Sequence, residues 1–128
     1  LGTTLNGAPQ RVSSTAALAR AILYATTPYM FQGEDRAHFE RLAAAVKHPL
    51  FGADCYAYGL VASGFADLVC EADLKPYDYF APAAVIEGAG GTVTDWKGLP
   101  LSLASGGHVL AAATPDLHEA ALRALASR

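Results

Sequence analysis

The chain has 128 residues, of which 52% are hydrophobic and 16% are charged, and its formal net charge is -3. A chain of this length can form one domain around a single core. The acidic balance argues against nucleic acid as a partner, because neutralising phosphates requires a basic face. No apolar run is long enough to span a bilayer, so we do not expect a membrane partner.

Several features suggest that this segment belongs to something larger. Charged residues are scarcer than the roughly one quarter that is usual in soluble domains. We therefore expect one face to be covered by another domain, or by a second subunit in a homodimer. The chain also begins without a methionine, and Asn6-Gly7 is typical of a hairpin turn that needs a longer strand before it. We interpret residues 1–128 as a single domain at the C-terminal end of a larger protein.

Short apolar runs predict strands, and longer runs with helical periodicity predict helices. After the turn, residues 8–12 predict a short strand, and a hydroxyl side chain at 13–15 is expected to cap a helical turn through residue 19. The predicted strands cover residues 21–26, 50–52, 67–72, 92–95 and 108–113. The predicted helices cover residues 34–47, 53–63, 78–89 and 115–126. This alternation predicts an α/β layered domain with a mostly parallel or mixed sheet flanked by helices.

Proline, glycine and threonine set the expected limits of the helices. Pro49 is expected to end the first helix, and Pro82 is tolerable in the third because it falls near the first turn. Gly90-Gly91 supplies a left-handed cap for that helix, and Thr114 caps the last one. The second helix is apolar on nearly all sides, so we expect it to lie in the interior.

The histidines and cysteines give little indication of chemistry. The histidines do not cluster and none is assigned to catalysis: His38, His48, His108 and His118. His38 and His118 are expected at solvated helix positions. Cys55 and Cys70 lie in apolar contexts without metal-type spacing, which favours buried thiols in a reducing cytoplasm.

Two carboxylates flank a strand-to-helix turn that Pro76 stiffens. Asp78 fits the N-cap of the following helix, where a carboxylate can also offer a hard oxygen ligand to a divalent cation. Glu71 ends an apolar strand, where an unpaired charge is costly. An exposed strand end or a partner such as Lys75 would explain it. Asp54 likewise fits the N-cap of the second helix.

An ordered set of segments covers nearly the whole chain: Gly52-Ala53-Asp54-Cys55-Tyr56-Ala57-Tyr58, residues 61–67, Glu71, Lys75-Pro76-Tyr77-Asp78, residues 87–91 and Thr94-Asp95. This pattern resembles the C-terminal half of the inositol monophosphatase family, in which a Trp-Asp pair opens a helix that ends in Glu-Ala-Gly-Gly. Tyr77 stands here in place of that tryptophan. Together with residues 54–58, it is most similar to the branch that hydrolyses histidinol phosphate.

The resemblance implies an α-β-α-β-α phosphatase fold and Mg²⁺-dependent hydrolysis of a small phosphorylated alcohol. In that family an N-terminal half supplies most metal ligands through a Glu-Glu motif and an Asp-Pro-(Ile/Leu)-Asp-Gly-Thr motif. Neither motif occurs here. No catalytic residue is therefore expected in this segment, and the isolated chain is expected to be inactive without the missing N-terminal half.

The family's roles can be transferred to five positions. Asp78 matches the metal-binding aspartate, which also approaches the substrate, and Glu71 matches the glutamate that accepts hydrogen bonds from the substrate's alcohol part. Gly52, Ala53 and Asp54 match a segment that lines the same pocket. A carboxylate at 54 could pair with an amine, which would favour an amino alcohol over a polyol.

Three interpretations of the function follow. Histidinol phosphate, from histidine biosynthesis, is the first expected substrate, and inositol 1-phosphate or another small sugar or polyol phosphate is the second. From a different class, the chain could be a non-catalytic fragment or binding module. The presence of both Glu71 and Asp78 favours the enzyme interpretation, because a protein without activity would be free to lose them.

Overall fold

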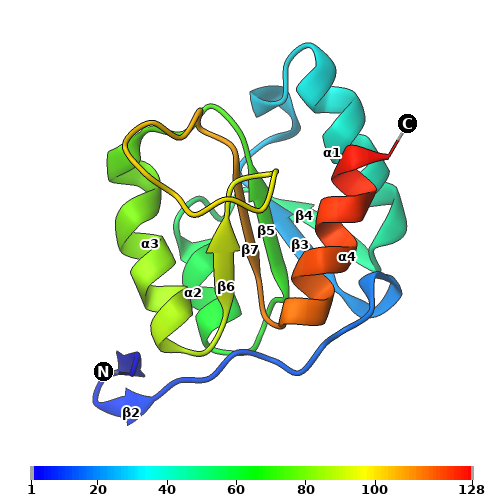
Figure 1. Ribbon diagram of the computed structural model, residues 1–128. Coiled ribbons are helices and arrows are strands. Elements are labelled where there is room, and N and C mark those ends of the chain that lie inside the picture. Colours follow the sequence, from blue (N-terminus) through cyan, green and yellow to red (C-terminus); the bar gives the residue numbers. More distant parts are fainter. Residues whose placement is uncertain (1, 128) are drawn as a thin grey trace.

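The computed structural model describes residues 2–127. Within them, a mixed five-stranded sheet lies between two layers of helices (Figure 1). The strands are β3 (Ile22–Ala25), β4 (His48–Phe51), β5 (Leu68–Glu71), β6 (Thr92–Thr94) and β7 (Val109–Ala112). Their spatial order is β4-β3-β5-β7-β6, with β3 parallel to β4 and β5, and β7 antiparallel to β5 and β6. The predicted layered α/β fold with a mixed sheet is confirmed.

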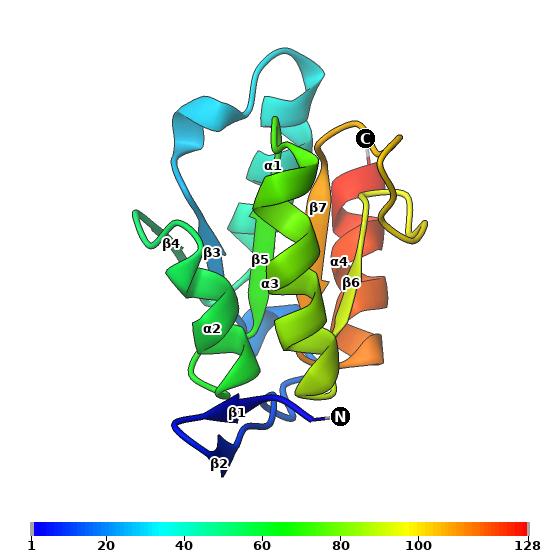
Figure 2. The ribbon, with the colours of Figure 1, turned by 90° about the vertical axis from the view of Figure 1, so that its left-hand side faces the viewer.

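Four α-helices cover the two faces of the sheet, and they are α1 (Glu34–Ala45), α2 (Tyr56–Ala62), α3 (Pro76–Gly88) and α4 (Pro115–Ala126). Helices α1 and α4 pack together on one face, and α2 and α3 pack together on the other (Figure 2). Short 3₁₀ turns, η1 (Leu18–Arg20) and η2 (Pro28–Met30), precede and follow β3. Among the described residues, no helix combines the length and apolarity needed to cross a membrane.

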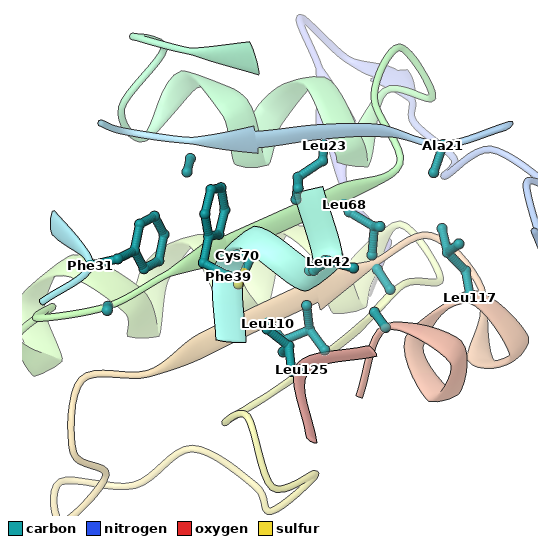
Figure 3. Packing of buried hydrophobic residues seen from close by; sticks show 14 residues of the cluster. Ala21, Leu23, Phe31, Phe39, Leu42, Leu68, Cys70, Leu110, Leu117 and Leu125 are labelled. Carbon is teal, nitrogen blue, oxygen red and sulfur yellow. The ribbon is translucent and has the colours of Figure 1, made fainter. Parts of the chain in front are cut away.

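The hydrophobic core has two parts because successive strand residues point to opposite faces. On the α1/α4 side, Leu23, Leu68 and Leu110 come from three adjacent strands and meet Leu42 and Leu125 of the helices (Figure 3). On the α2/α3 side, Val69, Ala111 and Val93 pack against α2 and α3. The central strands β5 and β7 are buried on both faces, which accounts for their continuous apolar sequences.

The N-terminal hairpin forms as predicted, but its second strand is short. Asn6 and Gly7 both have positive φ (51° and 83°), as a type I′ turn between β1 (Thr4–Leu5) and β2 (Ala8–Pro9) requires. The predicted strand 8–12 was too long because the chain leaves the pairing after residue 10. The Val12 N–H then donates to the Ala89 carbonyl. The hairpin lies at the end of the sheet opposite the carboxyl ends of β3 and β5 (Figure 1).

Two expectations near the first strands were wrong. No side chain caps η1, because the Ser13 hydroxyl donates to the buried Asp67 carboxylate instead. The strand predicted at 50–52 spans His48–Phe51, so Pro49 lies inside a strand and the preceding helix already ends at Ala45. Proline is tolerated there because β4 is an edge strand with a free side.

The helices facing the second core part also differ from expectation. Helix α2 begins at Tyr56 instead of residue 53, and it buries only one side, since Tyr56 is exposed. Helix α3 begins at Pro76, two residues early, so Pro82 falls in its second turn. The C-terminal cap forms as predicted: Gly91 N–H bonds the Ile86 carbonyl and Gly90 N–H bonds the Glu87 carbonyl, with Gly90 at φ 95°.

Candidate functional site

A pocket of 370 Å³ opens beyond the carboxyl ends of the parallel strands, and its lining residues are Thr26, Met30, Asp54, Cys55, Tyr58, Glu71, Leu74 and Asp78. Thr26 directly follows β3, Glu71 ends β5, and the loop after β4 carries Asp54. Carboxyl ends of adjacent parallel strands meet at one edge of a sheet, which is the usual place for a ligand in an open α/β fold. The structure therefore brings together Asp54, Glu71 and Asp78, three of the five predicted site residues.

Glu71 is a buried carboxylate that is held by hydrogen bonds. Glu71 is only 3% exposed. Oε2 accepts from the Thr26 N–H at 3.0 Å and from the Thr26 hydroxyl, and Oε1 accepts from the Tyr58 hydroxyl at 2.8 Å. The alternatives of an exposed strand end or a Lys75 partner were wrong. The burial cost of this charge is offset by three donors.

Tyr58 is the donor that faces Glu71 from helix α2. Burial raises the pKa of its hydroxyl well above the usual value, and the Glu71 charge raises it further. Tyr58 thus keeps its proton and can serve as a donor to the carboxylate throughout the physiological pH range. Tyr58 is buried and also lines the pocket.

Asp78 lies exposed in the first turn of α3 and is not the N-cap, contrary to the prediction. Lys75 occupies that position, and the Asp78 Oδ2 atom accepts a hydrogen bond from the Lys75 N–H at 2.8 Å. Asp78 lies inside the first turn and not at the N-cap because the helix already begins at Pro76. Among residues 2–127, no hydrogen bond engages Asp78 Oδ1, so that oxygen is free to act as a ligand.

The segment 52–54 has a more limited role in the geometry than predicted. Asp54 is exposed, lines the pocket and adopts φ 49°, but Cys55 takes the N-cap position of α2. Gly52 and Ala53 do not line the pocket. Gly52, at φ 92°, donates its N–H to the Thr26 carbonyl at 3.0 Å, so the segment is fastened beside the pocket by its backbone.

The carboxylates of the pocket are the chemical kind of ligand that suits magnesium, but they do not form a complete set of ligands. Asp54, Glu71 and Asp78 offer only oxygen atoms, which are the ligands that Mg²⁺ prefers. Within residues 2–127, however, no three His, Cys, Asp or Glu side chains form a group that could hold a metal ion. Asp78 therefore offers one unengaged oxygen of the kind that Mg²⁺ prefers, and the described residues do not complete a metal site around it.

A second, polar pocket of 250 Å³ adjoins the first at Met30. In it, His108 Nε2 lies 2.8 Å from Asp35 Oδ2, and the His108 ring stacks on Trp96 with centroids 4.0 Å apart. Asp35 and His108 lie at the edge of the α1/α4 layer, and neither of them contacts the carboxylates of the first pocket. The histidines thus remain unassigned to catalysis.

Three expectations about histidine and cysteine were wrong. His118 is only 8% exposed, and its Nε2 lies 2.7 Å from the Thr94 hydroxyl. His38 is half-buried and contacts the Leu125 carbonyl. Cys70 is buried as predicted, whereas Cys55 is exposed at the pocket rim because α2 starts after it.

Thr26 is a pocket residue that was not predicted from the sequence. A signal was present, since Thr26 directly follows an apolar strand and parallel strands share their carboxyl edge. What the sequence could not supply was that β3 and β5 are neighbours. That pairing places the Thr26 N–H against Glu71, 45 positions further along the chain.

Comparison with known proteins places this arrangement among phosphatases. A profile described as "Inositol monophosphatase family" matches residues 1–128. The chain is 46% identical over 130 residues to the chloroplastic bifunctional phosphatase IMPL2 of Arabidopsis thaliana, covering 96% of this chain and 38% of that protein. It is 29% identical over 98 residues to a histidinol-phosphatase of Chlorobaculum parvum, covering 76% of this chain and 38% of that protein.

Solved structures show the same fold. An inositol monophosphatase from Zymomonas mobilis superposes with a TM-score of 0.95 at 42% identity, over 98% of this chain and 49% of that one. An inositol monophosphatase from Anabaena superposes with a TM-score of 0.85 at 31% identity, over 98% of this chain and 50% of that one. The chain thus spans about half the length of these solved relatives and less of the curated ones.

Proposed function

This chain belongs to the inositol monophosphatase family, and we propose that it forms the substrate-side domain of a Mg²⁺-dependent phosphomonoesterase. The observation that carries the proposal is one pocket at the carboxyl edge of the sheet that contains Asp54, Glu71 and Asp78. The named phosphatases among its relatives support a hydrolase.

Histidinol phosphate is the substrate that we propose first. It carries an ammonium group, and the pocket offers two carboxylates, Asp54 and Glu71, besides the proposed metal ligand. An ammonium group is attracted to a carboxylate by its charge as well as by hydrogen bonding, which favours an amine over a neutral hydroxyl here. The name of the Chlorobaculum relative agrees with this choice. Inositol 1-phosphate is the second candidate, supported by the Zymomonas structure at 42% identity.

The residues of this chain would bind and orient the substrate. Asp78 would hold Mg²⁺ through Oδ1, while Oδ2 stays hydrogen-bonded to the Lys75 N–H and fixes the carboxylate direction. Mg²⁺, when bound, provides positive charge for the phosphoryl oxygens and lowers the pKa of a water. Glu71 would accept a hydrogen bond from the alcohol part, and Tyr58 would keep water away from its inner side.

We place the remaining metal ligands and the water-activating group on an N-terminal half, which we take to be a partner of this domain. In this proposal the isolated chain hydrolyses nothing at a useful rate, since within residues 2–127 no cluster of metal ligands is complete. A cytoplasmic location and a homodimer are further parts of the proposal. Cell fractionation and sedimentation of the whole protein test them.

The decisive experiment uses the whole protein that carries this segment, with Mg²⁺ and a panel of histidinol phosphate, inositol 1-phosphate and sugar phosphates. We expect histidinol phosphate to give the highest kcat/KM. Asp78→Asn keeps an acceptor for the Lys75 N–H but removes the charge, so kcat/KM should fall on the order of a hundredfold or more. The Mg²⁺ concentration for half-maximal activity should rise as well.

Asp116→Asn is the matched control, because Asp116 is also an exposed aspartate in the first turn of a helix. Asp116→Asn should leave kcat/KM and the Mg²⁺ concentration for half-maximal activity unchanged. Turnover of no phosphate ester by the wild-type protein, or an unchanged Mg²⁺ requirement in Asp78→Asn, would contradict the proposal. Mg²⁺-dependent turnover by the isolated 128-residue chain would contradict its division between two halves.

A further inference from the structure

The Glu71 carboxylate has little accepting capacity left for a ligand. Two carboxylate oxygens provide about four acceptor positions. Thr26 fills both positions on Oε2 through its N–H and its hydroxyl, and Tyr58 fills one on Oε1. Among the described residues no further donor reaches Glu71, so one position on Oε1 remains for the pocket.

The two donors are themselves held firmly. Tyr58 is 2% exposed and packs in the core between α2 and α3, so its hydroxyl cannot turn away without disturbing that core. The Thr26 N–H belongs to the backbone directly after β3, which pairs with β5. The carboxylate is therefore fixed in orientation from both sides, and Glu71 lines the same cavity as Asp54.

This arrangement discriminates between two kinds of alcohol. A vicinal diol binds a carboxylate best with one hydroxyl on each oxygen, and here Oε2 has no position left for the second hydroxyl. An ammonium group can place one N–H on the free position of Oε1 and direct another to Asp54. The second hydroxyl of a diol also has only Asp54 to turn to, and a neutral hydroxyl gains less from two carboxylates than a cation does, so the diol binds less well.

We propose that Tyr58, together with Thr26, is a positioning residue that leaves Glu71 a single acceptor position and thereby selects amino alcohol phosphates over vicinal diol phosphates. The inference rests on the proposed function and deepens it. Neither residue touches the reacting phosphorus in this scheme. Their loss should therefore change substrate affinity and selectivity, while kcat stays close to the wild-type value.

The test measures kcat and KM of the whole protein with Mg²⁺ for histidinol phosphate and for inositol 1-phosphate. Tyr58→Phe frees a second position on Oε1 and loosens the carboxylate. We expect KM for histidinol phosphate to rise about tenfold, which is the worth of one hydrogen bond to a charged group. The ratio of kcat/KM between the two substrates should fall by a similar factor. Thr26→Val should also raise KM for histidinol phosphate and lower the ratio between the two substrates. Thr26→Ser keeps the hydroxyl and should have the wild-type KM.

Tyr79→Phe is the control for a merely structural effect. Tyr79 is also a buried tyrosine facing the second core part, but its hydroxyl donates to the Ser102 carbonyl at 2.7 Å. It should lower stability without changing KM or selectivity. An unchanged substrate ratio in Tyr58→Phe, or a loss confined to kcat, overturns the inference and leaves the proposed function intact.

Calorimetric binding of histidinol, the free alcohol, separates the two claims. If the wild-type protein hydrolyses no phosphate ester, the proposed function fails. Weaker histidinol binding by Tyr58→Phe than by Tyr79→Phe would then still support the positioning role, and equal binding would overturn it.

Discussion

Two buried carboxylates bracket the central pair of parallel strands. Asp67 precedes β5 and accepts from the Ile22 N–H at 2.8 Å, at the start of β3. Glu71 ends β5 and accepts from the Thr26 N–H at 3.0 Å, directly after β3. Each charge is satisfied by backbone donors that a shift of register would remove. A buried carboxylate is therefore structural at one end of the strand and lines the candidate pocket at the other.

His118 shows how a single buried group makes stability depend on pH. Thr94 donates its hydroxyl proton to the Asp95 carbonyl, so His118 Nε2 is the donor to the Thr94 oxygen. Burial lowers the pKa of His118 from 6.5. Below that value the unfolded chain takes up the proton before the folded one does, so the free energy of unfolding falls as pH drops from 6.5 toward the folded pKa.

We predict that His118→Gln removes this part of the pH dependence. Glutamine can still donate to Thr94 but does not titrate. Urea unfolding at about pH 7.5 and pH 5.5 should show a smaller loss of stability in the variant than in the wild type. All other titratable groups are common to both proteins, so their contribution cancels in the difference. Identical losses would contradict the prediction.

At the scale of elements, the start of α4 was predictable to the residue because its signals are local. The Thr114 hydroxyl accepts from the Leu117 N–H at 3.2 Å, and Pro115 occupies the first helical position. The same hydroxyl donates to the Thr15 carbonyl at 2.8 Å and joins the cap to the segment before β3. The cap therefore contributes both to the helix and to a tertiary contact.

We predict that Thr114→Ala lowers the free energy of unfolding by about 1 to 2 kcal/mol, because both bonds are lost. Thr114→Ser keeps the oxygen and should lose less than half of that. Chemical denaturation followed by circular dichroism measures the difference. Equal effects of alanine and serine would show that the methyl group, and not the cap, matters at this position.

At the scale of the whole molecule, large apolar side chains are exposed on the outer side of the α2/α3 layer, and they are Tyr56, Tyr77 and Val85. A groove along this side shares Cys55, Tyr58 and Asp78 with the pocket at the carboxyl edge of the sheet. In the proposed function, a companion half that brings metal ligands to Asp78 would approach over this side. We therefore propose the α2/α3 side as its docking surface, in agreement with the low charge content.

Tyr77→Ser tests this placement. Tyr77 is 83% exposed here, and Leu103, in the loop between β6 and β7, is 79% exposed. In the isolated chain we expect both Tyr77→Ser and Leu103→Ser to be nearly neutral. In the whole protein, Tyr77→Ser should cost about 2 kcal/mol, because a buried aromatic contact is lost. A lowered thermal midpoint for Tyr77→Ser alone would support the proposal, and equal midpoints for both variants would contradict it.

Patterns in the amino-acid sequence were enough to predict the layered α/β class, the hairpin at Asn6-Gly7, the C-terminal cap of α3 and the N-terminal cap of α4. They also predicted Asp54, Glu71 and Asp78, which the structure brings into one pocket. The elements followed from local chemistry, in which apolar periodicity, turn glycines and capping oxygens act over a few residues. The site residues followed from their family resemblance, whose ordered motifs keep their spacing along the chain. The predicted starts of two helices were wrong, since α3 begins at Pro76 and α2 begins at Tyr56.

The groups that satisfy the buried charges could not be predicted before the chain was seen folded. Strand neighbours far apart in the chain place Thr26 beside Glu71, and the packing of α2 on the sheet brings Tyr58 to the other oxygen. Packing likewise buried His118 and left Cys55 exposed. Such contacts depend on the order of strands and on the faces that helices present, and no local rule of the sequence specifies either.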